Sequence, residues 1–136
     1  MLYDVIVAGA GPGGCAAAMA AARTGARTLL IERYGFLGGM ATAGLVNPFM
    51  PFEIVHKDTG RREAVSAGLF TEIVDELCRR GAYLDRAFDE ETIKFVLDDM
   101  VAAAGARVLL HALVAGVRMA GQRIEAVEVE AKCGRQ

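Results

Sequence analysis

A glycine-rich turn between an apolar run and an alanine-rich stretch is the feature that most constrains this sequence. The turn is GAGPGG at residues 9–14, and the apolar residues 5–7 precede it. Residues 2–8 predict a buried strand, because such strands read as continuous apolar runs. The alanine-rich residues 13–24 predict a helix, which Gly25 ends as a C-terminal cap. The glycines therefore lie where a strand ends and a helix begins.

A second strand and an acidic residue follow this helix. Residues 27–32 contain the apolar run TLLI and predict another buried strand. Strand, helix and strand within about thirty residues form a βαβ unit, whose crossover is right-handed. Glu32 stands at the end of the second strand. A carboxylate there can accept hydrogen bonds from both hydroxyls of an adenosine ribose, and it would repel a 2′-phosphate.

Each glycine of the turn has a physical role if a dinucleotide binds here. Gly9 permits the tight turn, Gly11 lets the backbone approach a pyrophosphate, and Gly14 lets the helix pack closely on the strand. The helix N-terminus offers free N–H groups and a partial positive charge to the phosphates. The turn together with Glu32 therefore predicts an adenine-dinucleotide site.

The rest of the chain predicts an α/β fold with an irregular insertion. Residues 33–63 lose all periodicity and are punctuated by glycine and proline, and a loop of this length is usually functional or mobile. Further elements follow in chain order: a helix over 64–80, a helix over 89–104 with Asp89 as its N-cap, a strand over 107–111, and a hairpin of 113–119 with 123–130.

Charge and hydropathy exclude several classes of partner. The net charge of −2 is spread over both signs without a basic block, which argues against nucleic acid. The mean hydropathy is +0.32, but the longest tempting run, residues 15–22, falls far short of the ~20 apolar residues of a membrane span. No cationic leader precedes the first strand, so we expect no signal peptide.

The three cysteines are far apart in the sequence and form no zinc or disulfide pattern. We therefore expect a reducing, cytoplasmic location and no metal site. Cys15 and Cys78 fall on apolar faces of the expected helices, which predicts two core thiols.

The spacing beyond the glycines points to a family. Ala18 and Gly25 continue the turn into the pattern G-x-G-x-x-G-x-x-x-A-x-x-x-x-x-x-G, followed by Glu32. This resembles the FAD-dependent oxidoreductases with the glutathione-reductase-type FAD/NAD(P)-binding Rossmann fold. The stretch LGGMATAGLVNPF at 37–49 is similar to the second FAD-contacting segment of that group, and residues 89–136 are similar to its helix, third strand and antiparallel β-meander.

The resemblance implies which residues bind FAD. The GAGPGG turn would hold the pyrophosphate, and Glu32 and Arg33 would bind the adenosine ribose. Residues 38–42, here called the Gly-Gly segment, would line the pyrophosphate–ribityl side. Val114 would meet the adenine through its backbone. The implied set is Gly9, Ala10, Gly11, Pro12, Gly13, Gly14, Glu32, Arg33, Gly38, Gly39, Met40, Ala41, Thr42 and Val114.

Two departures from the family limit what the chain implies. No cysteine pair follows Gly39, so dithiol chemistry is rejected and any redox chemistry belongs to the flavin. Relatives continue with further strands and a substrate domain. We therefore expect a single Rossmann-like domain over 1–136 that is an N-terminal fragment, inactive alone. Its second hairpin strand would lack a partner, and its open sheet edges would pair with another copy. Substrate and catalytic residues stay unassigned.

Two other interpretations remain open from the residues alone. The chain is also compatible with an NAD-binding dehydrogenase domain, which Glu32 permits, although Pro12, the GGMAT segment and the β-meander favour FAD. The third interpretation is a folded fragment that binds no cofactor.

Overall fold

Three parallel strands form the central layer of the computed structural model, which describes residues 2–136. β1 (Val5–Ala8), β2 (Thr28–Ile31) and β7 (Arg107–Leu109) are hydrogen-bonded in the order β1-β2-β7. The parallel register pairs the last residues of β1 and β2 with each other, so their carboxyl ends meet at one edge of the sheet. The predicted βαβ unit is confirmed, with its first strand starting at residue 5 instead of 2.

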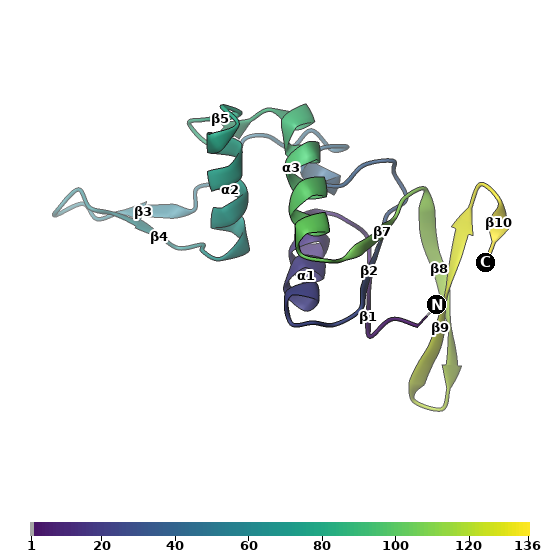
Figure 1. The fold of residues 1–136 in the computed structure, drawn as a ribbon. Coiled ribbons are helices and arrows are strands. Elements are labelled where there is room, and N and C mark those ends of the chain that lie inside the picture. Colours follow the sequence, from purple (N-terminus) through teal and green to yellow (C-terminus); the bar gives the residue numbers. More distant parts are fainter. Residues whose placement is uncertain (1) are drawn as a thin grey trace.

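Two helices cover one face of this sheet (Figure 1). α1 (Pro12–Arg23) connects β1 to β2, and α3 (Glu90–Ala103) packs beside it. The side chain of Asp89 accepts a hydrogen bond from the backbone N of Thr92 at 2.6 Å, which confirms the predicted N-cap of α3. Fully buried side chains from both helices meet those of the sheet, among them Cys15, Met19, Leu30, Val96 and Val101.

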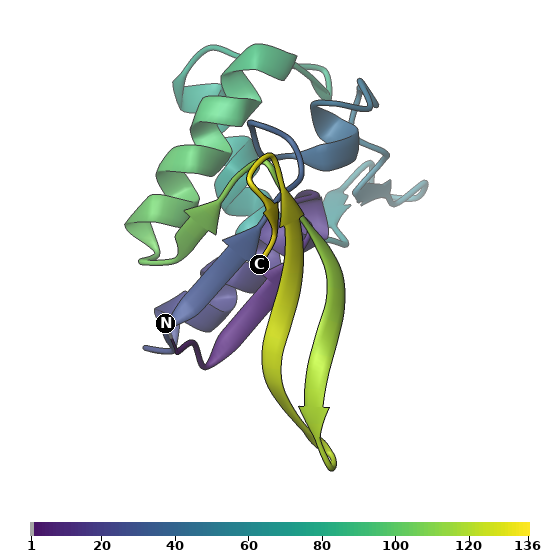
Figure 2. The same cartoon turned by 90° about the vertical axis from the view of Figure 1, so that its right-hand side faces the viewer.

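A long antiparallel ribbon covers the opposite face, as Figure 2 shows. It consists of β8 (Ala112–Ala120) and β9 (Arg123–Ala131), close to the predicted hairpin. Ile31 of the sheet, Ala112 and Val129 form a small buried cluster between the two layers. The short strand β10 (Gly134–Arg135) pairs with β9, so the expectation that the second hairpin strand lacks a partner is wrong.

The stretch expected to be irregular contains defined structure. The 3₁₀ helix η1 (Gly39–Ala41) follows the Gly-Gly pair, and β3 (Glu53–Val55) pairs with β4 (Arg62–Ala64) in a hairpin that reaches away from the other layers (Figure 1). Side chains on both faces of this hairpin are exposed, so it lacks the apolar alternation by which strands are recognised.

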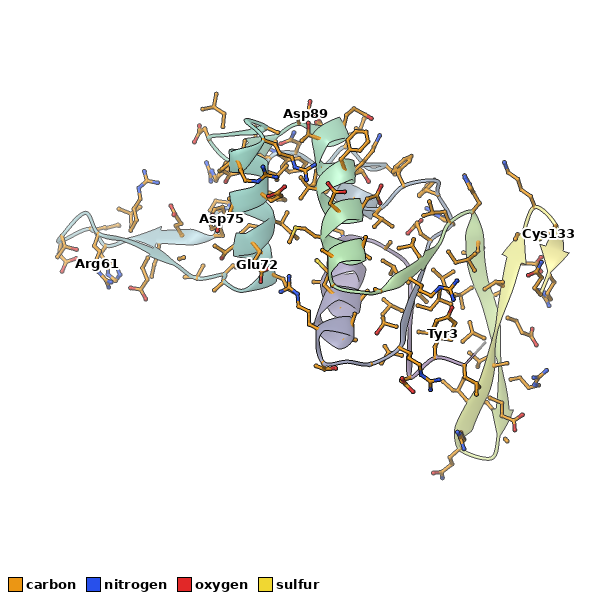
Figure 3. The ribbon with its side chains drawn as sticks, in the orientation of Figure 1. Tyr3, Arg61, Glu72, Asp75, Asp89 and Cys133 are labelled. Atoms are coloured by element: carbon orange, nitrogen blue, oxygen red, sulfur yellow. The ribbon has the colours of Figure 1, made fainter. Side chains whose placement is uncertain are left out.

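The next helix, α2 (Leu69–Arg79), begins five residues later than the predicted 64. Ala64 is paired in the hairpin with Glu53, and Gly68 adopts a positive φ of 68°, which a helix cannot continue. Glu72 on α2 points toward α1 (Figure 3), where its carboxylate binds Arg23 at 2.7 Å. Arg80, just after α2, binds Asp99 of α3 at the same distance.

A small hairpin that the sequence analysis did not predict follows α2. β5 (Tyr83–Leu84) and β6 (Ala87–Phe88) are joined by Asp85 and Arg86, which both have positive φ angles, 46° and 70°. Two-residue hairpin loops of this kind usually contain Asn and Gly. The dipeptide Asp85-Arg86 therefore does not predict a turn.

The prediction of two core thiols is half right. Cys15 is fully buried between α1 and the core, but Cys78 is exposed. Its neighbour Leu77 occupies the buried side of α2. Successive helical residues point about 100° apart, so Cys78 is turned toward solvent.

Candidate functional site

The glycine turn connects the carboxyl end of β1 to α1 by close backbone packing. Gly9 has a φ of 90° and its N–H donates to the carbonyl of Ile31 at 2.8 Å. A Cβ added to Gly14 would lie 1.9 Å from the carbonyl oxygen of Gly9. Only glycine therefore fits at position 14, as the sequence pattern implies.

The start of α1 is open to a ligand. Pro12 stands in its first turn, and no side chain caps the helix at Gly11. A Cβ added to Gly9, Gly11 or Gly13 would meet no atom within 4 Å. The backbone N–H groups of the first turn and the positive end of the helix dipole thus border free space, an arrangement that suits phosphate oxygens.

Glu32 lies buried beside this opening, with 5% of its surface exposed. Its Oε2 accepts from the N–H of Ala10 at 2.7 Å, and its Oε1 accepts from the N–H of Tyr34 at 2.9 Å. Each carboxylate oxygen carries a second lone pair, so hydroxyl donors of a ligand can still be accepted. The carboxylate therefore fixes the backbone of the glycine turn at Ala10 and that of the following segment at Tyr34.

Arg33 extends away from Glu32 and is exposed. Its guanidinium donates to the hydroxyl of Tyr34 at 2.9 Å and lies 4.6 Å from the centre of the same ring. The cation is thus held by the Tyr34 side chain.

The Gly-Gly segment lies directly against the glycine turn, although about thirty residues separate them. Gly38 donates its N–H to the carbonyl of Ala10 at 2.8 Å, and a Cβ added to Gly39 would lie 2.7 Å from the Cα of Gly11. The side chain of Met40 is mostly exposed beside them. The two segments that the resemblance pairs are therefore brought together by backbone contacts.

Three other residues of the implied set face the protein interior. Ala41 and Thr42 are buried, and the Thr42 hydroxyl donates to the carbonyl of Leu37 at 2.7 Å, so it closes the η1 turn. Val114 pairs with Val129 in the ribbon and packs on the small cluster around Ile31. Its side chain serves packing, which leaves its backbone as the only part available to a ligand.

Sequence reasoning missed the aromatic side of the opening. Tyr34 stacks on Phe36 at 5.8 Å between ring centres, and the ammonium group of Lys94 lies 4.3 Å from the centre of the Phe36 ring. His111 has a positive φ of 56°, and a Cβ added to Gly35 would lie 2.8 Å from its ring. In the sequence YGF at 34–36, Gly35 predicts an irregular segment, and no periodic pattern marks the two aromatic residues as part of a surface.

In the part of the chain that the structure describes, neither the Cys15 thiol nor a metal site supplies further chemistry. Burial raises the pKa of the Cys15 thiol to about 12, and its Sγ donates to the carbonyl of Ala10, so it is not a nucleophile. Over residues 2–136, no group of His, Cys, Asp and Glu side chains could hold a metal ion. Within the same residues, no helix has the length and apolarity that a bilayer crossing requires.

A model of the FAD dependent oxidoreductase family matches residues 4–136. The chain belongs to this family. FAD is accordingly its cofactor, and the α/β fold with an FAD-binding βαβ unit is that of its structural relatives. The prediction of an FAD-binding portion of an oxidoreductase is confirmed at this level, and FAD is favoured over the NAD-binding alternative.

Individual curated proteins are similar to this chain over limited lengths. Digeranylgeranylglycerophospholipid reductase of Methanocaldococcus jannaschii is 57% identical over 27% of this chain and 10% of its own length. A 3-oxosteroid 1-dehydrogenase of Mycobacterium tuberculosis is 35% identical over 70% of this chain and 17% of its own length. The chain thus spans less than a fifth of these two relatives.

The solved structures show the fold. The myxobacterial chondrochloren halogenase CndH, described as a variant of FAD-dependent halogenases, superposes with a TM-score of 0.61 at 20% identity. The match covers 98% of this chain and 34% of the halogenase. A likeness at this identity concerns the arrangement of elements and says nothing about substrate.

Proposed function

We propose that the opening at the carboxyl ends of β1 and β2 holds the ADP half of FAD. The GAGPGG turn at 9–14 and the start of α1 receive the pyrophosphate, and Glu32 accepts the hydroxyls of the adenosine ribose. Gly38 to Thr42 border the ribityl side mainly through their backbone, Arg33 lies beside the ribose, and the backbone of Val114 lies toward the adenine. The observation that supports this most is the Glu32 carboxylate, which is buried and bound to Ala10 of the turn at 2.7 Å.

We further infer that the whole protein is an oxidoreductase whose redox chemistry is that of the flavin. FAD supplies hydride or single-electron transfer when bound, and a protein contributes binding, orientation and electrostatics. In this chain the glycine turn orients the diphosphate and Glu32 fixes the adenosine end. Self-association through the open edges of β1 and β7 is a further prediction.

Glu32→Ala tests this proposal in a calorimetric titration with FAD. The substitution removes hydrogen bonds to a charged acceptor, which are worth about 1.5–3 kcal/mol, so the dissociation constant should rise about ten- to hundredfold. Glu32→Gln keeps an acceptor for Ala10 but loses the charge, and it should give an intermediate value.

Asp98→Ala is the matched control, because Asp98 is an exposed acidic residue of α3, a helix that contributes no residue to the implied set. It should leave the affinity for FAD unchanged. Equal losses in the Glu32 and Asp98 variants would remove Glu32 from the site, and tighter binding of NAD than of FAD would overturn the assignment of the opening to FAD.

A further inference from the structure

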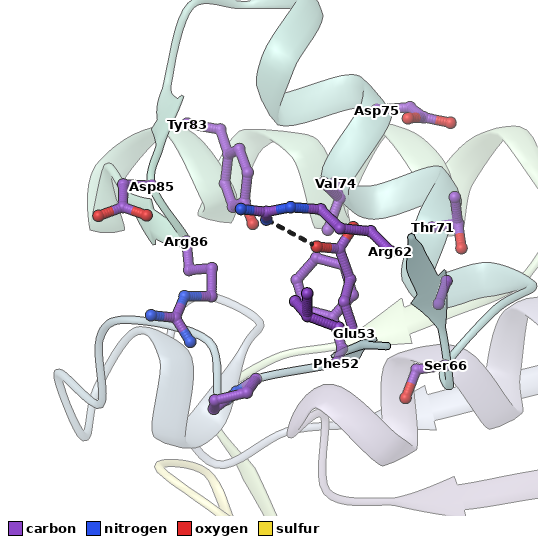
Figure 4. Close-up of a pocket in the computed structure, with 13 residues that line it drawn as sticks. Phe52, Glu53, Arg62, Ser66, Thr71, Val74, Asp75, Tyr83, Asp85 and Arg86 are labelled. Atoms are coloured by element: carbon purple, nitrogen blue, oxygen red, sulfur yellow. Dashed lines mark hydrogen bonds and ion pairs between the residues drawn. The ribbon is translucent and has the colours of Figure 1, made fainter. Parts of the chain in front are cut away.

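A second hollow lies between the β3–β4 hairpin, α2 and the β5–β6 turn (Figure 4). Its volume is about 690 Å³, within the range of small-molecule sites. None of the residues that line it belongs to the GAGPGG turn or to the Gly-Gly segment. It is therefore separate from the opening proposed for FAD.

Aromatic side chains form one wall of the hollow. Phe52 and Tyr83 line it, and both are anchored from behind. Phe52 packs edge-on against Phe70 at 4.8 Å between ring centres, and Tyr83 lies 6.3 Å from Phe49. Rings that are already held in place offer apolar contact area to a ligand at little cost in conformational entropy.

Five charged side chains line the hollow, and two of them neutralise each other. Arg62 binds Glu53 at 3.2 Å across the hairpin. Among residues 2–136, no ion pair or side-chain hydrogen bond engages Asp75, Asp85 or Arg86. One guanidinium and two carboxylates are thus available to a ligand.

Asp85 and Arg86 are consecutive and both line one side of the hollow, where their side chains point in different directions (Figure 4). Both have positive φ angles, a conformation that is uncommon for residues other than Gly, Asn and Asp. The carbonyl of Arg86 accepts from the N–H of Phe49 at 3.0 Å, which ties the turn to the segment that follows η1. Asp75 stands on the other side, on α2.

We propose that this hollow binds a small zwitterion of the amino-acid type. The ligand's carboxylate binds Arg86, its ammonium group binds Asp85, and its apolar body lies against Phe52 and Tyr83. An α-amino acid carries its ammonium and carboxylate groups on the same carbon atom, so two residues of opposite charge that are adjacent in the chain can bind both groups. The site is independent of the FAD opening, so its test does not depend on flavin binding.

The test is a titration of the full chain, without FAD, with three probes that share a phenyl ring. L-Phenylalanine has both charges, 3-phenylpropionate lacks the ammonium group, and 2-phenylethylamine lacks the carboxylate. We expect saturable binding of L-phenylalanine at millimolar concentration, and weaker binding of the other two. Arg86→Asn should weaken L-phenylalanine and 3-phenylpropionate about two- to fivefold but leave 2-phenylethylamine unchanged, and Asp85→Asn should affect L-phenylalanine and 2-phenylethylamine instead.

Asparagine tolerates a positive φ, so both variants should keep the turn, and circular dichroism with urea unfolding verifies this. Asp75→Asn is the matched control from the other side of the hollow, and it should change none of the three affinities. The proposal is overturned if L-phenylalanine does not saturate at millimolar concentration, if the three probes bind equally, or if Asp75→Asn has the effect assigned to Asp85→Asn.

Discussion

At the scale of single residues, the glycine turn distinguishes positions that contact protein from positions that border free space. Gly14 has no room for a methyl group, whereas Gly13, its neighbour in the same helical turn, has room on every side. The two glycines are alike in sequence but differ in what a side chain would meet. The fold therefore requires glycine at position 14, whereas at position 13 only a bound ligand would require it.

Gly14→Ala should destabilise the protein by about 1–3 kcal/mol or more, because the new methyl group would overlap the carbonyl oxygen of Gly9. Gly13→Ala should instead leave the free energy of unfolding unchanged or raise it by about 0.4–1 kcal/mol, since alanine restricts the unfolded chain. Urea unfolding of both variants measures the difference. Equal stabilities would contradict the packing at Gly14.

The sequence was informative about Glu32 but not about its partners. Its position after the second strand followed from spacing alone. The N–H groups of Ala10 and Tyr34 that bind its carboxylate belong to the backbone, which any residue supplies. Likewise, Thr42 was expected at the ligand, and only the fold reveals that its hydroxyl donates to Leu37.

At the scale of elements, α2 is joined to its neighbours by charged side chains. Arg23 of α1 binds Glu72, and Arg80 bridges Glu76 of α2 and Asp99 of α3. Hydrogen bonds from Arg79 and Arg80 hold the pKa of Glu76 at about 2, below its usual value of 4.5. The ion pairs that Glu76 forms at the end of α2 should therefore depend on pH.

A carboxyl whose pKa is lowered by folding stabilises the protein fully above its unfolded pKa, and this contribution is lost as the pH falls toward the folded pKa. For Glu76 the window runs from about 4.5 down to about 2. Glu76→Gln should lower the free energy of unfolding at neutral pH. The stability of this variant should also fall less steeply across this pH window. Thermal unfolding at several pH values measures it.

Glu91→Gln is the control, because among residues 2–136 Glu91 forms an ion pair with one cation, Lys94 of α3, whereas Glu76 pairs with two arginines. Its pH profile should follow that of the unsubstituted chain. If the Glu76 variant kept the original profile, the ion pairs of Glu76 would not contribute to stability.

Elements with an apolar face were predictable, and those without one were not. α3 was found almost to the residue, since Ile93, Val96 and Leu97 repeat at helical spacing and Asp89 caps it. The β3–β4 hairpin exposes both faces, so its pairing depends on backbone hydrogen bonds and exposed ion pairs that leave no periodic pattern.

At the scale of the whole molecule, the proposed FAD opening lies where the layers meet. The parallel sheet is covered by helices on one face and by the β8–β9 ribbon on the other (Figures 1 and 2). Glu32 follows β2, and its carbonyl accepts from Ala112 at the start of β8, at 3.0 Å. A ligand bound there would contact segments from all three layers.

FAD should therefore stabilise the entire fold and not only the glycine turn. A ligand that binds only the folded state at one hundred times its dissociation constant raises the free energy of unfolding by about 2.7 kcal/mol. We expect a single urea transition that moves to higher concentration with FAD. NAD at the same concentration serves as the control, and an equal shift with NAD, or no shift with FAD, would contradict the prediction.

The stacked Tyr34 also makes the chain suited to optical measurement. The sequence contains three tyrosines and no tryptophan, so tyrosine emission is not masked. Tyr34 is 39% exposed, and its N–H is bound to the Glu32 carboxylate, which places one of the three emitters next to the proposed ribose position. A flavin absorbs in the ultraviolet region where tyrosine emits. The decrease in tyrosine emission thus gives an intrinsic, label-free signal by which the binding of the flavin can be followed over time.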